Sequence, residues 1–585
     1  MERDREWFRY PRINADACIH CNLCEKVCPA LNAENPIRAA YPEPSCYAAS
    51  HKSTEIRFRS TSGGVFSALA MQMYREGGYV GGAVESPDGV KHIISNNPED
   101  LNALRRSKYT QSDARGFYAE VRRLLKAGEK VLAVGTPCMI AGMRRFLKRD
   151  YENLVLVDFV CNSLMSPRLV ELVKDYEGRQ AGSPVVHYHA KDKEVSWGKL
   201  VTRFDFKNGE SVYRIGRGKG ENNLRLRLYH THVGSRPSCD SCLYRGFPRF
   251  ADITLADYWG GEKYHPALDD DMGTSLVLTN SPAGERLFAK VKDRMVCEDS
   301  KFEWATEGNP AFFKTSTTCP VDRDAFFADL DAGMLIEDVL RKHVPTRSAS
   351  APGMLKRLRS AAGCLCRVVL PELRRHVGLS PLQLWRFVRL NFLSRNIRTD
   401  WRSNALLYPY RDAVLEIDPT ARICLKGPMV VGKPRLRKSR VETRLLLERG
   451  ACLTVEGLFT VGYGSDVELF AGARLNVNEV VVNSFLTLIC ADEITFTGQT
   501  WIGREVSIRD TNAHLVALDG YKVVAPVVIR NHTWLCSRCN INPGTQLGAG
   551  CVVAGLSNVS GKVPAHSLVS GSPAKVAVKD VLWKH

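Results

Sequence analysis

The sequence of 585 residues lacks any long hydrophobic run, since no window approaches the about 20 uninterrupted apolar residues of a membrane-spanning helix. The segment 1–12 is charged and lacks the apolar core of a secretory signal, which predicts a cytoplasmic protein. In that compartment the 19 cysteines are expected as metal ligands or buried thiols and not as disulfides. The chain is too long for a single hydrophobic core, so several domains are expected.

Acidic residues are scarce in the segment 346–404, which holds twelve Lys or Arg and only two acids. This surplus of ten is more than half of the net charge of +18. A break rich in Ser, Ala, Pro and Gly opens the segment, and apolar residues then recur at helical spacing: Leu355, Leu358, Leu365, Val368, Val369, Leu384, Trp385, Val388, Leu390 and Leu393. The pattern predicts a basic amphipathic linker over 346–405, which either docks on neighbouring domains or lies on an anionic lipid surface. No nucleic-acid motif accompanies the charge, so no nucleic-acid partner is expected.

Four cysteines near the amino terminus have the C-x-x-C-x-x-C-x-x-x-C-P spacing of bacterial ferredoxins: Cys18, Cys21, Cys24 and Cys28. This spacing lets thiolates surround one [4Fe–4S] cluster, whereas a structural zinc site normally shows two separated C-x-x-C pairs. In two-cluster ferredoxins the last cysteine serves the other cluster, and this chain has a single run. The fourth ligand is therefore either Cys28 or Cys46, and we predict a ferredoxin-like segment over 1–46.

A second set of cysteines consists of Cys138, Cys161, Cys239 and Cys242. Short apolar strands are predicted over 131–134 and 154–160, and each leads to one of these cysteines, the first through a tight turn at Gly135 and Thr136. The other two form a C-x-x-C pair. Four thiolates suffice for a second cluster or a zinc site, although each cysteine at a strand end is alternatively a buried core thiol.

Several short motifs follow one another between 62 and 260: S-G-G (62–64), S-K-Y-T-Q-S (107–112), G-T-P-C (135–138), R-P-S-C-D-S-C (236–242) and A-D-I-T-L-A-D-Y-W-G (251–260). In order and spacing they resemble the beta subunits of coenzyme F-420 hydrogenases and dehydrogenases, over about 13–312. The resemblance implies an α/β domain over 47–345 that binds FAD beside an iron–sulfur cluster on the second cysteine set. It implies a flavin site lined by Ser62, Gly63, Gly64, Ser107, Lys108, Tyr109, Gln111, Gly135 and Thr136.

The electron donor implied by this resemblance is ferredoxin or a reduced deazaflavin coenzyme. Many relatives have two ferredoxin runs where this chain has one, so the number of clusters is one or two. Relatives also often carry C-H-G where this chain has Cys161, Asn162 and Ser163. Asp257 and Trp259 lie on a motif typical of the polysaccharide-cluster branch, and their role is left open between substrate binding and packing.

Aliphatic residues recur every six positions in the last part of the chain: Val455, Val461, Val467, Ile529, Leu535, Ile541, Leu547, Val553 and Val559. This period is typical of a parallel β-helix, in which each coil has three flat sides and one aliphatic residue per side points to the axis. We predict such a β-helix over 406–585, with corners at Gly462, Gly503, Gly548 and Gly550.

Four motifs in this region are W-I-G-R-E-V-S-I-R-D-T-N-A-H (501–514), N-H-T-W-L-C (531–536), I-N-P-G-T-Q-L-G-A-G (541–550) and S-G-S-P-A-K (570–575). They resemble the left-handed β-helix hexapeptide acyltransferases, notably the O-acetyltransferases of surface-polysaccharide gene clusters. The resemblance implies His514 as the general base, Asp510 as a residue that shapes the turn or orients the ring, and Trp534 beside the channel for acetyl-CoA. It also implies a homotrimer with active sites between subunits.

Together these patterns predict a multidomain protein of surface-polysaccharide biosynthesis. An Fe–S and FAD-dependent oxidoreductase is joined to a CoA-dependent transferase that acetylates a sugar or lipid-linked glycan, and the linker contacts the inner face of the membrane. Two alternatives keep the transferase and make the amino-terminal half a zinc-stapled scaffold or a redox sensor. His532 and His566 are expected at the surface, and Cys536 and Cys539 as buried thiols.

Overall fold

The computed structural model describes residues 1–28, 30–32, 39–216, 222–314, 319, 321–344, 374, 380–400, 403–434, 440–514 and 522–584. The chain forms two compact units. Unit 1 comprises Met1–Phe204 and Tyr213–Thr346 with Lys584, and unit 2 comprises Arg347–Trp583 with Asp205–Val212. Most of the linker predicted over 346–405 lies outside the described residues, including Leu355, Leu358, Leu365, Val368 and Val369.

The strands numbered up to 14 are β1 (Glu2–Arg3), β2 (Arg9–Tyr10), β3 (Ser45–His51), β4 (Tyr79–Ser86), β5 (Gly89–Ser95), β6 (Ser112–Asp113), β7 (Val131–Val134), β8 (Leu154–Phe159), β9 (Val185–Asp192), β10 (Val201–Phe206), β11 (Ser211–Arg214), β12 (Ile253–Asp257), β13 (Ser275–Thr279) and β14 (Met295–Ser300). The helices of unit 1 are α1 (Leu23–Val27), α2 (Thr54–Phe58), α3 (Val65–Arg75), α4 (Leu101–Leu104), α5 (Phe117–Lys126), α6 (Pro137–Leu147), α7 (Pro167–Ala181), α8 (Leu224–Thr231), α9 (Pro282–Ala289), α10 (Phe302–Glu307), α11 (Arg323–Asp331) and α12 (Ile336–His343).

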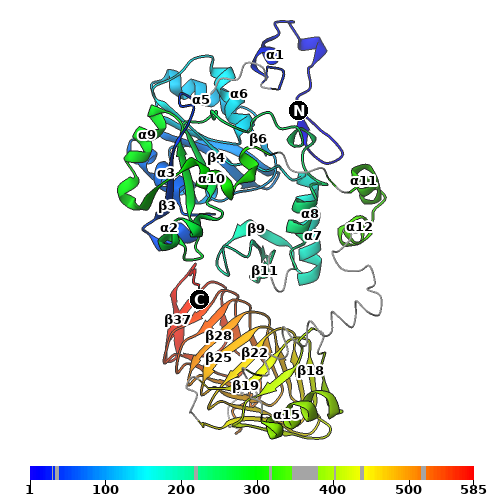
Figure 1. Cartoon of the computed structure of the whole chain (residues 1–585). Helices are drawn as coiled ribbons and strands as arrows, with labels where there is room; N and C mark the ends of the chain where they lie inside the picture. Colours follow the sequence, from blue (N-terminus) through cyan, green and yellow to red (C-terminus); the bar gives the residue numbers. More distant parts are fainter. Residues whose placement is uncertain are drawn as a thin grey trace. The chain divides into compact units, whose positions relative to one another are not determined.

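The core of unit 1 is a mixed β-sheet with helices on both faces (Figure 1). Among the described residues its strand order is β14-β3-β13-β12-β8-β7-β4-β5-β6. The alternation of side chains along β7 shows the two faces: Leu132 packs in the cluster that includes α3 and α9, whereas Val131 and Ala133 pack with α5 and α6. Unit 1 is thus the α/β domain that the sequence predicts.

The site-bearing edge of this sheet follows from its central parallel strands. β7 pairs with β8 in parallel, and β8 pairs with β12 in parallel. The carboxyl ends of all three strands therefore lie at one edge, where ligands and catalytic residues of open α/β sheets usually gather. Gly135 directly follows β7, and Cys161 and Trp259 lie two positions after the ends of β8 and β12.

Unit 2 begins with α15 (Pro381–Val388) and a π-helical turn, Arg389–Leu393. Its strands are β15 (Ile397–Arg398), β16 (Leu407–Pro409), β17 (Ala413–Ile417), β18 (Arg422–Leu425), β19 (Met429–Lys433), β20 (Thr443–Leu447), β21 (Cys452–Val455), β22 (Phe459–Gly462), β23 (Asp466–Leu469), β24 (Arg474–Val477), β25 (Val480–Ser484), β26 (Thr487–Cys490), β27 (Glu493–Phe496), β28 (Thr500–Arg504), β29 (Ser507–Arg509), β30 (Val527–Ile529), β31 (Thr533–Leu535), β32 (Asn540–Ile541), β33 (Gln546–Leu547), β34 (Val552–Val553), β35 (Asn558–Val559), β36 (Lys562–Val563), β37 (Leu568–Gly571) and β38 (Ala574–Val578).

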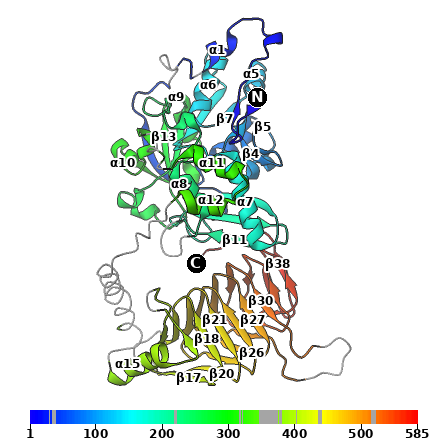
Figure 2. The same cartoon turned by 90° about the vertical axis from the view of Figure 1, so that its right-hand side faces the viewer.

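These strands form a left-handed parallel β-helix, with coil stacked on coil from β17 and β20 towards β38 (Figure 2). Successive strands of the chain belong in turn to three sheets, and each strand pairs in parallel with the strand three places later. Among the described strands of the β-helix, only the last pair, β37 with β38, is antiparallel. The predicted fold of the carboxyl-terminal part is therefore confirmed.

The interior of the β-helix is filled by the residues of the six-residue repeat. All nine repeat positions named above are at most 1% exposed. At Gly462 a Cβ atom would lie 1.8 Å from the carbonyl oxygen of Asn483 on the next coil, and at Gly548 it would lie 2.3 Å from the amide nitrogen of Ala565. Glycine is required at these two positions because adjacent coils approach closely there.

The carboxyl-terminal part of the predicted linker packs on this β-helix. Phe387 of α15 is buried against Leu406 and Tyr408 at the first coil. Among the described residues, no helix combines the length and the hydropathy that a membrane crossing requires.

Candidate functional site

The second cysteine set comes together at the sheet edge. Cys138 lies in the first turn of α6, Cys161 follows β8, and the other two lie in and after a 3₁₀ turn, Pro237–Cys239. Burial raises the pKa of Cys161, and the thiols of Cys138, Cys239 and Cys242 raise it further. Burial, with the thiols of Cys138 and Cys242, also raises the pKa of Cys239 to about 11. Each thiol thus lies within electrostatic reach of the others.

Backbone hydrogen bonds fix the loops that carry these thiols. The amide of Gly135 donates to the carbonyl of Val157 at 3.1 Å, which ties the turn after β7 to β8. Thr136 is the N-cap residue of α6, and its Oγ1 lies 3.0 Å from the Sγ of Cys138. The amide of Cys239 donates to the carbonyl of Arg236 at 2.8 Å. The predicted strand–turn arrangement is confirmed to within a residue.

The chemistry of these residues fits an iron–sulfur cluster. No group of three or more Cys, His, Asp or Glu in the described ranges is arranged to hold a single metal ion. A cube binds each thiolate at a different iron atom, so its ligands do not converge on one point as the ligands of zinc do. The four thiols are half-buried, and burial raises the pKa of Cys138 and of Cys161, which the charges of Arg236 and Arg245 respectively lower. Such thiols would hold a cluster, which supplies one-electron transfer when bound.

The ferredoxin-like run lies beside this second set. Cys18 and Cys28 are half-buried, whereas Cys21 and Cys24 are exposed. Burial raises the pKa of Tyr244, and the thiols of Cys138, Cys28 and Cys242 raise it further. Tyr244 is therefore close both to the end of the first run and to the second cysteine set.

Cys46, the alternative fourth ligand, lies elsewhere. It belongs to β3 and is buried in a hydrophobic cluster with Tyr258 and Leu276. Burial raises its pKa to about 12, and its Sγ contacts the carbonyl of Pro44 at 3.6 Å. The structure thus gives Cys46 the surroundings of a core thiol and leaves Cys28 as the better placed candidate.

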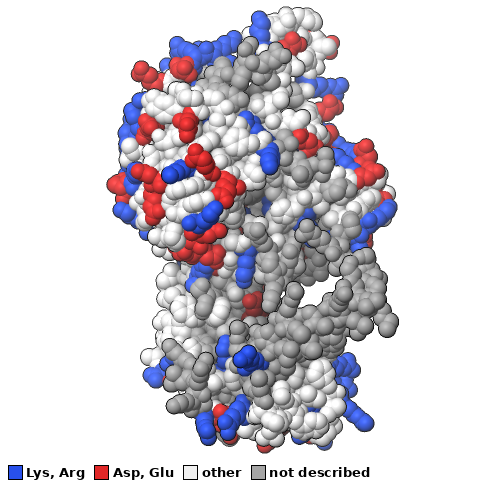
Figure 3. Space-filling view, in the orientation of Figure 1, with Lys and Arg blue, Asp and Glu red and all other residues white. Residues whose placement is uncertain are grey.

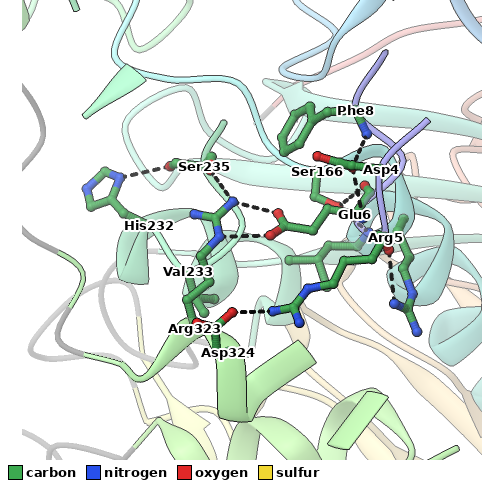
Figure 4. A network of polar contacts seen from close by, with 12 residues as sticks. Asp4, Arg5, Glu6, Phe8, Ser166, His232, Val233, Ser235, Arg323 and Asp324 are labelled. Carbon is green, nitrogen blue, oxygen red and sulfur yellow. Dashed lines mark hydrogen bonds and ion pairs between the residues drawn. The ribbon is translucent and has the colours of Figure 1, made fainter. Parts of the chain in front are cut away.

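A polar network holds the amino-terminal segment next to the loop that leads to Cys239 (Figure 4). The guanidinium of Arg323 donates to both carboxylate oxygens of Glu6, at 2.8 and 2.5 Å, and to the carbonyl of Ser235 at 2.6 Å. The hydroxyl of Ser166 donates to the carbonyl of Glu6 at 2.7 Å. Figure 4 shows these groups pointing toward one another from segments far apart in the sequence.

Gln111, predicted to line a flavin, joins the same region. Its amide accepts from the amide of Arg9 at 2.6 Å and donates to the carbonyl of Arg9 at 3.0 Å. Both polar ends of the side chain are therefore used to hold β2. Gln111 therefore positions the amino-terminal strand β2 within the protein.

The S-G-G motif stands at the start of α3. Gly64 is its N-cap with φ +91°, and a Cβ at Gly63 would lie 2.3 Å from the carbonyl oxygen of Ala49. The hydroxyl of Ser62 donates to the carbonyl of Thr274 at 2.9 Å. Close packing against the sheet is therefore a sufficient reason for a glycine at position 63, without a bound flavin.

The second predicted flavin segment is also engaged inside the protein. The ammonium of Lys108 donates to the carbonyls of residues 103–106, at 2.5 to 3.4 Å, and burial lowers its pKa to about 8. The amide of Ser107 donates to the hydroxyl of Thr61 at 3.1 Å. Tyr109 packs edge-on against Tyr229, with ring centroids 5.6 Å apart. The side chains of Ser62, Lys108 and Gln111 therefore already have partners, and they do not by themselves fit a bound FAD.

One cluster contains residues that the sequence motifs missed. The ammonium of Lys191 donates to Asp257 at 2.6 Å and lies 4.6 and 4.4 Å from the ring centroids of Trp197 and Trp259, which stack at 4.3 Å. Asp257 and Trp259 were visible as a motif. Lys191 and Trp197 lie in and after β9, where no motif marks them. This arrangement shows that Asp257 and Trp259 pack with a buried ion pair at the same sheet edge.

In unit 2 the predicted base His514 and its neighbour Asp510 differ in their surroundings. His514 is exposed, and its amide donates to the carbonyl of Asn512 at 2.7 Å. The carboxylate of Asp510 is fully buried and accepts from the amides of Ala491 and Asp492 at 2.7 and 2.8 Å. Of the two predicted roles for Asp510, shaping the corner of a coil is the one seen.

The expectation of a surface position for His532 was wrong. Its ring is 1% exposed and stacks on Trp583 at 4.2 Å, because the chain after β38 returns over this face of the β-helix. Trp534 is 42% exposed and lies 5.8 Å from the same Trp583. Cys539 is buried, as predicted, whereas Cys536 is only half-buried. His566 is half-buried.

Comparison with known families divides the chain in the same way. A model described as 4Fe-4S binding domain matches residues 10–33. Models for the N-terminal and C-terminal parts of the coenzyme F420 hydrogenase/dehydrogenase beta subunit match residues 46–115 and 128–303. The motifs recognised in the sequence are thus confirmed for unit 1.

Relatives of the β-helix are acetyltransferases by name. WbbJ of Escherichia coli K12, named as a lipopolysaccharide biosynthesis O-acetyl transferase, is 28% identical over 134 residues, which are 21% of this chain and 68% of that protein. The Staphylococcus aureus Mu50 acetyltransferase SAV2555 is 36% identical over 61 residues, which are 10% of this chain and 31% of that protein. The chain thus spans about a third of the length of the staphylococcal relative.

Two solved structures are also similar to this chain. The F420-reducing [NiFe] hydrogenase complex of Methanosarcina barkeri is similar at 20% identity, with a TM-score of 0.33, over 52% of this chain and 94% of that chain. The hexapeptide-repeat acetyltransferase VCA0836 of Vibrio cholerae, complexed with acetyl coenzyme A, is similar at 18% identity, with a TM-score of 0.17, over 40% of this chain and 91% of that chain. The family models and the named relatives, and not these two structures, identify the chain as a 4Fe-4S segment and both parts of the coenzyme F420 hydrogenase/dehydrogenase beta-subunit family joined to a hexapeptide-repeat acetyltransferase-like β-helix.

Proposed function

We propose that the protein is a bifunctional enzyme in which an iron–sulfur oxidoreductase and a sugar O-acetyltransferase act in one pathway of surface-polysaccharide assembly. The observation that carries the redox part is the meeting of Cys138, Cys161, Cys239 and Cys242 at one sheet edge. The acyl part rests on the resemblance of unit 2 to acetyltransferases and on the exposed His514.

The redox part would hold clusters on two neighbouring sets of thiols. Cys18, Cys21, Cys24 and Cys28 would bind the first, and the second set would bind the other. Tyr244, whose pKa is raised by thiols of both sets, would lie between the two clusters. Ferredoxin or a reduced deazaflavin would be the donor, and the exposed position of the first run suits an external partner.

FAD is proposed from the family resemblance alone. When bound, a flavin converts single electrons into hydride transfer to a substrate. The predicted side chains Ser62, Lys108 and Gln111 are engaged within the protein, so no step is assigned to them. Release of FAD from the denatured protein, measured by fluorescence, would support its presence.

The acyl part would transfer an acetyl group from acetyl-CoA to a hydroxyl of a sugar or a lipid-linked glycan. An imidazole nitrogen of His514 would take the hydroxyl proton while the oxygen attacks the thioester carbonyl. The carbon–sulfur bond then breaks, and the imidazolium returns its proton to the leaving thiolate. Trp534, exposed on β31, would contact the donor. The trimer implied by the family would be checked by sedimentation.

An ultraviolet–visible spectrum with iron, zinc and flavin analysis, on protein purified without oxygen, tests the redox part. A brown protein bleached by dithionite, with iron for two cubes, is expected. A colourless, folded, zinc-loaded protein would instead favour the scaffold alternative. A protein in which acetyl transfer changes with cluster oxidation, and which reduces no substrate, would favour the sensor alternative.

His514→Ala and His514→Gln test the acyl part. Each should lower acetyl transfer by about 10²- to 10⁴-fold, which is the usual contribution of a general base. Iron content and the unfolding transition should stay as they are, because His514 is exposed. Unchanged transfer in both variants would reject His514 as the base.

We further propose that the start of unit 2 contacts an anionic membrane surface. Leu382, Trp385, Phe392 and Leu393, on α15 and the turn after it, are 51 to 73% exposed, and basic side chains accompany them. On the face of unit 1 drawn in Figure 3, basic and acidic side chains are interspersed.

Sedimentation with vesicles tests this contact. Binding to vesicles with anionic lipid is expected, with little binding to neutral vesicles and a loss in Trp385→Glu. Thr487→Glu, an exposed change on β26, is the control. Equal binding by the Trp385 variant, or dissociation of a trimer instead, would reject a lipid partner for this face.

A further inference from the structure

Three arginines beside the second cysteine set keep buried nitrogen atoms without a hydrogen-bond partner. These atoms are Nε and Nη2 of Arg225, Nε of Arg236 and Nε of Arg245. A buried polar group without a partner is costly, and the cost is higher for a charged group. Negative charge close to these guanidinium groups would remove much of that cost.

Arg245 and Arg236 lie directly next to the thiols. Arg245 donates from Nη2 to the carbonyl of Asn162 at 2.7 Å, one residue after Cys161, and from Nη1 to the carbonyl of Ala311 at 2.6 Å. The carbonyl of Arg236 accepts from the amide of Cys239 at 2.8 Å. The side chain of Arg245 is thus anchored on the loop that carries Cys161. The side chain of Arg236 donates from Nη2 to the carbonyl of Arg9 at 3.5 Å, and its charge acts on the thiols of Cys138 and Cys239.

Arg225 lies one aromatic ring further away. Its side chain is 3% exposed, and its guanidinium lies 4.6 and 5.0 Å from the ring centroids of Tyr109 and Tyr229. No carboxylate of the described residues forms an ion pair with it. Tyr229 in turn interacts electrostatically with Cys161. A buried guanidinium therefore lies close to the thiols, and the partner seen for its charge is the hydroxyl of Tyr188 and not a carboxylate.

We propose that Arg225, Arg236 and Arg245 form a cationic frame that balances the charge of an iron–sulfur cluster on Cys138, Cys161, Cys239 and Cys242. This inference rests on the proposed function, because it requires a cluster at that site. A cube with four thiolates is anionic and gains one further negative charge when an electron enters. Buried positive charge stabilises the reduced state more than the oxidised state, so the frame raises the reduction potential. The arginines are positioning residues for charge and do not ligate iron.

A redox titration of the full-length, anaerobically purified protein tests the frame, with absorbance and electron paramagnetic resonance as readouts. Arg225→Gln, Arg236→Gln and Arg245→Gln should each shift the reduction equilibrium of this cluster about tenfold towards the oxidised state, which is about 59 mV for one electron. Arg225→Lys keeps the charge and should restore most of the shift. Arg115→Gln removes a guanidinium whose side chain is 69% exposed, and should leave the potential unchanged.

The outcomes separate this inference from the proposed function. Unchanged potentials in all three Gln variants, with iron retained, would overturn the frame and leave the cluster. A Cys161→Ser variant that keeps all the iron would overturn the cluster itself. Should Arg225→Gln fail to fold, the half-buried Arg236 and Arg245 carry the same prediction. A shift that Arg225→Lys does not restore would show that Arg225 acts through packing and not through charge.

Discussion

The two units differ in how their contacts are distributed along the chain. In unit 2, Leu535 pairs with Ile502 of the preceding coil and Val553 of the following one. In unit 1, Ala49 pairs with Ser275, and the cysteine site draws on segments from 138 to 242. Local, repeated contacts leave a period in the sequence, whereas contacts over long separations leave only isolated motifs. The sequence therefore predicts the fold of unit 2, whereas for unit 1 it predicts mainly candidate ligand residues.

The largest expected difference between the two units comes from the substitution of one cysteine ligand in unit 1. Cys242→Ser should cost unit 1 the iron of a whole cluster, because three remaining thiolates hold a cube poorly. The unfolding of unit 2 in urea should not change, since its coils contact each other. Iron analysis and far-ultraviolet circular dichroism measure the two effects separately.

Cys46→Ala is the matched control for that substitution. It removes a thiol that lies in the hydrophobic cluster of β3 and should leave the iron content unchanged. Loss of iron in this variant, with Cys28→Ser keeping its iron, would show that Cys46 is the fourth ligand of the first cluster after all.

A cavity in the repeat should give the next largest effect. Leu488 of β26 is fully buried, and Leu488→Ala should lower the free energy of unfolding of unit 2 by about 3 to 5 kcal/mol. Thr487→Ala, at the exposed neighbour, should change it by less than about 0.5 kcal/mol. Iron content should stay constant in both. Loss of iron in Leu488→Ala would show that the two units do not fold independently.

Different parts of the molecule were accessible from the sequence for physical reasons. The six-residue period predicted the β-helix and its inward residues, because every coil repeats the same packing. The strands before Cys138 and Cys161 were predicted because short apolar runs mark buried parallel strands. The roles of Lys108 and Gln111 were not accessible, because each depends on a partner carbonyl that sequence spacing does not reveal. The burial of His532 depends on a return of the chain, 51 residues later, to Trp583.

Substitution of Asp510, at a corner of the β-helix, should have a smaller effect on the unfolding free energy of unit 2. Asp510→Ala leaves two partly buried backbone amides without an acceptor and should cost about 2 to 4 kcal/mol of unfolding free energy. Asp510→Asn keeps one acceptor oxygen and should cost less. Acetyl transfer per folded molecule, and its pH profile, should stay as in the parent. A changed pH profile in Asp510→Asn would instead show that this carboxylate orients the ring of His514.

The smallest expected effect is a pH dependence of stability that concerns unit 1 and not unit 2. Glu76 in unit 1 accepts from Gln72, Lys130 and Lys290, all at 2.8 to 2.9 Å, and these hydrogen bonds lower its pKa from 4.5 to about 2. A carboxyl with a lowered folded-state pKa stabilises the fold above about pH 4.5, and this stabilisation disappears as the pH falls towards 2. Both lysines are about half exposed, so solvent screening reduces the contribution to about 1 to 2 kcal/mol.

Glu76→Gln should therefore lower the urea midpoint of unit 1 at pH 7, and the difference from the parent should shrink between pH 4.5 and pH 2. Lys130→Met and Lys290→Met each remove one partner and should each reproduce part of the effect at pH 7. The apolar core of unit 2 carries no comparable group at its repeat positions, so its midpoint should not respond to these substitutions. A loss in Glu76→Gln that is equally large at pH 3 would mean that packing, and not the charge of Glu76, accounts for it.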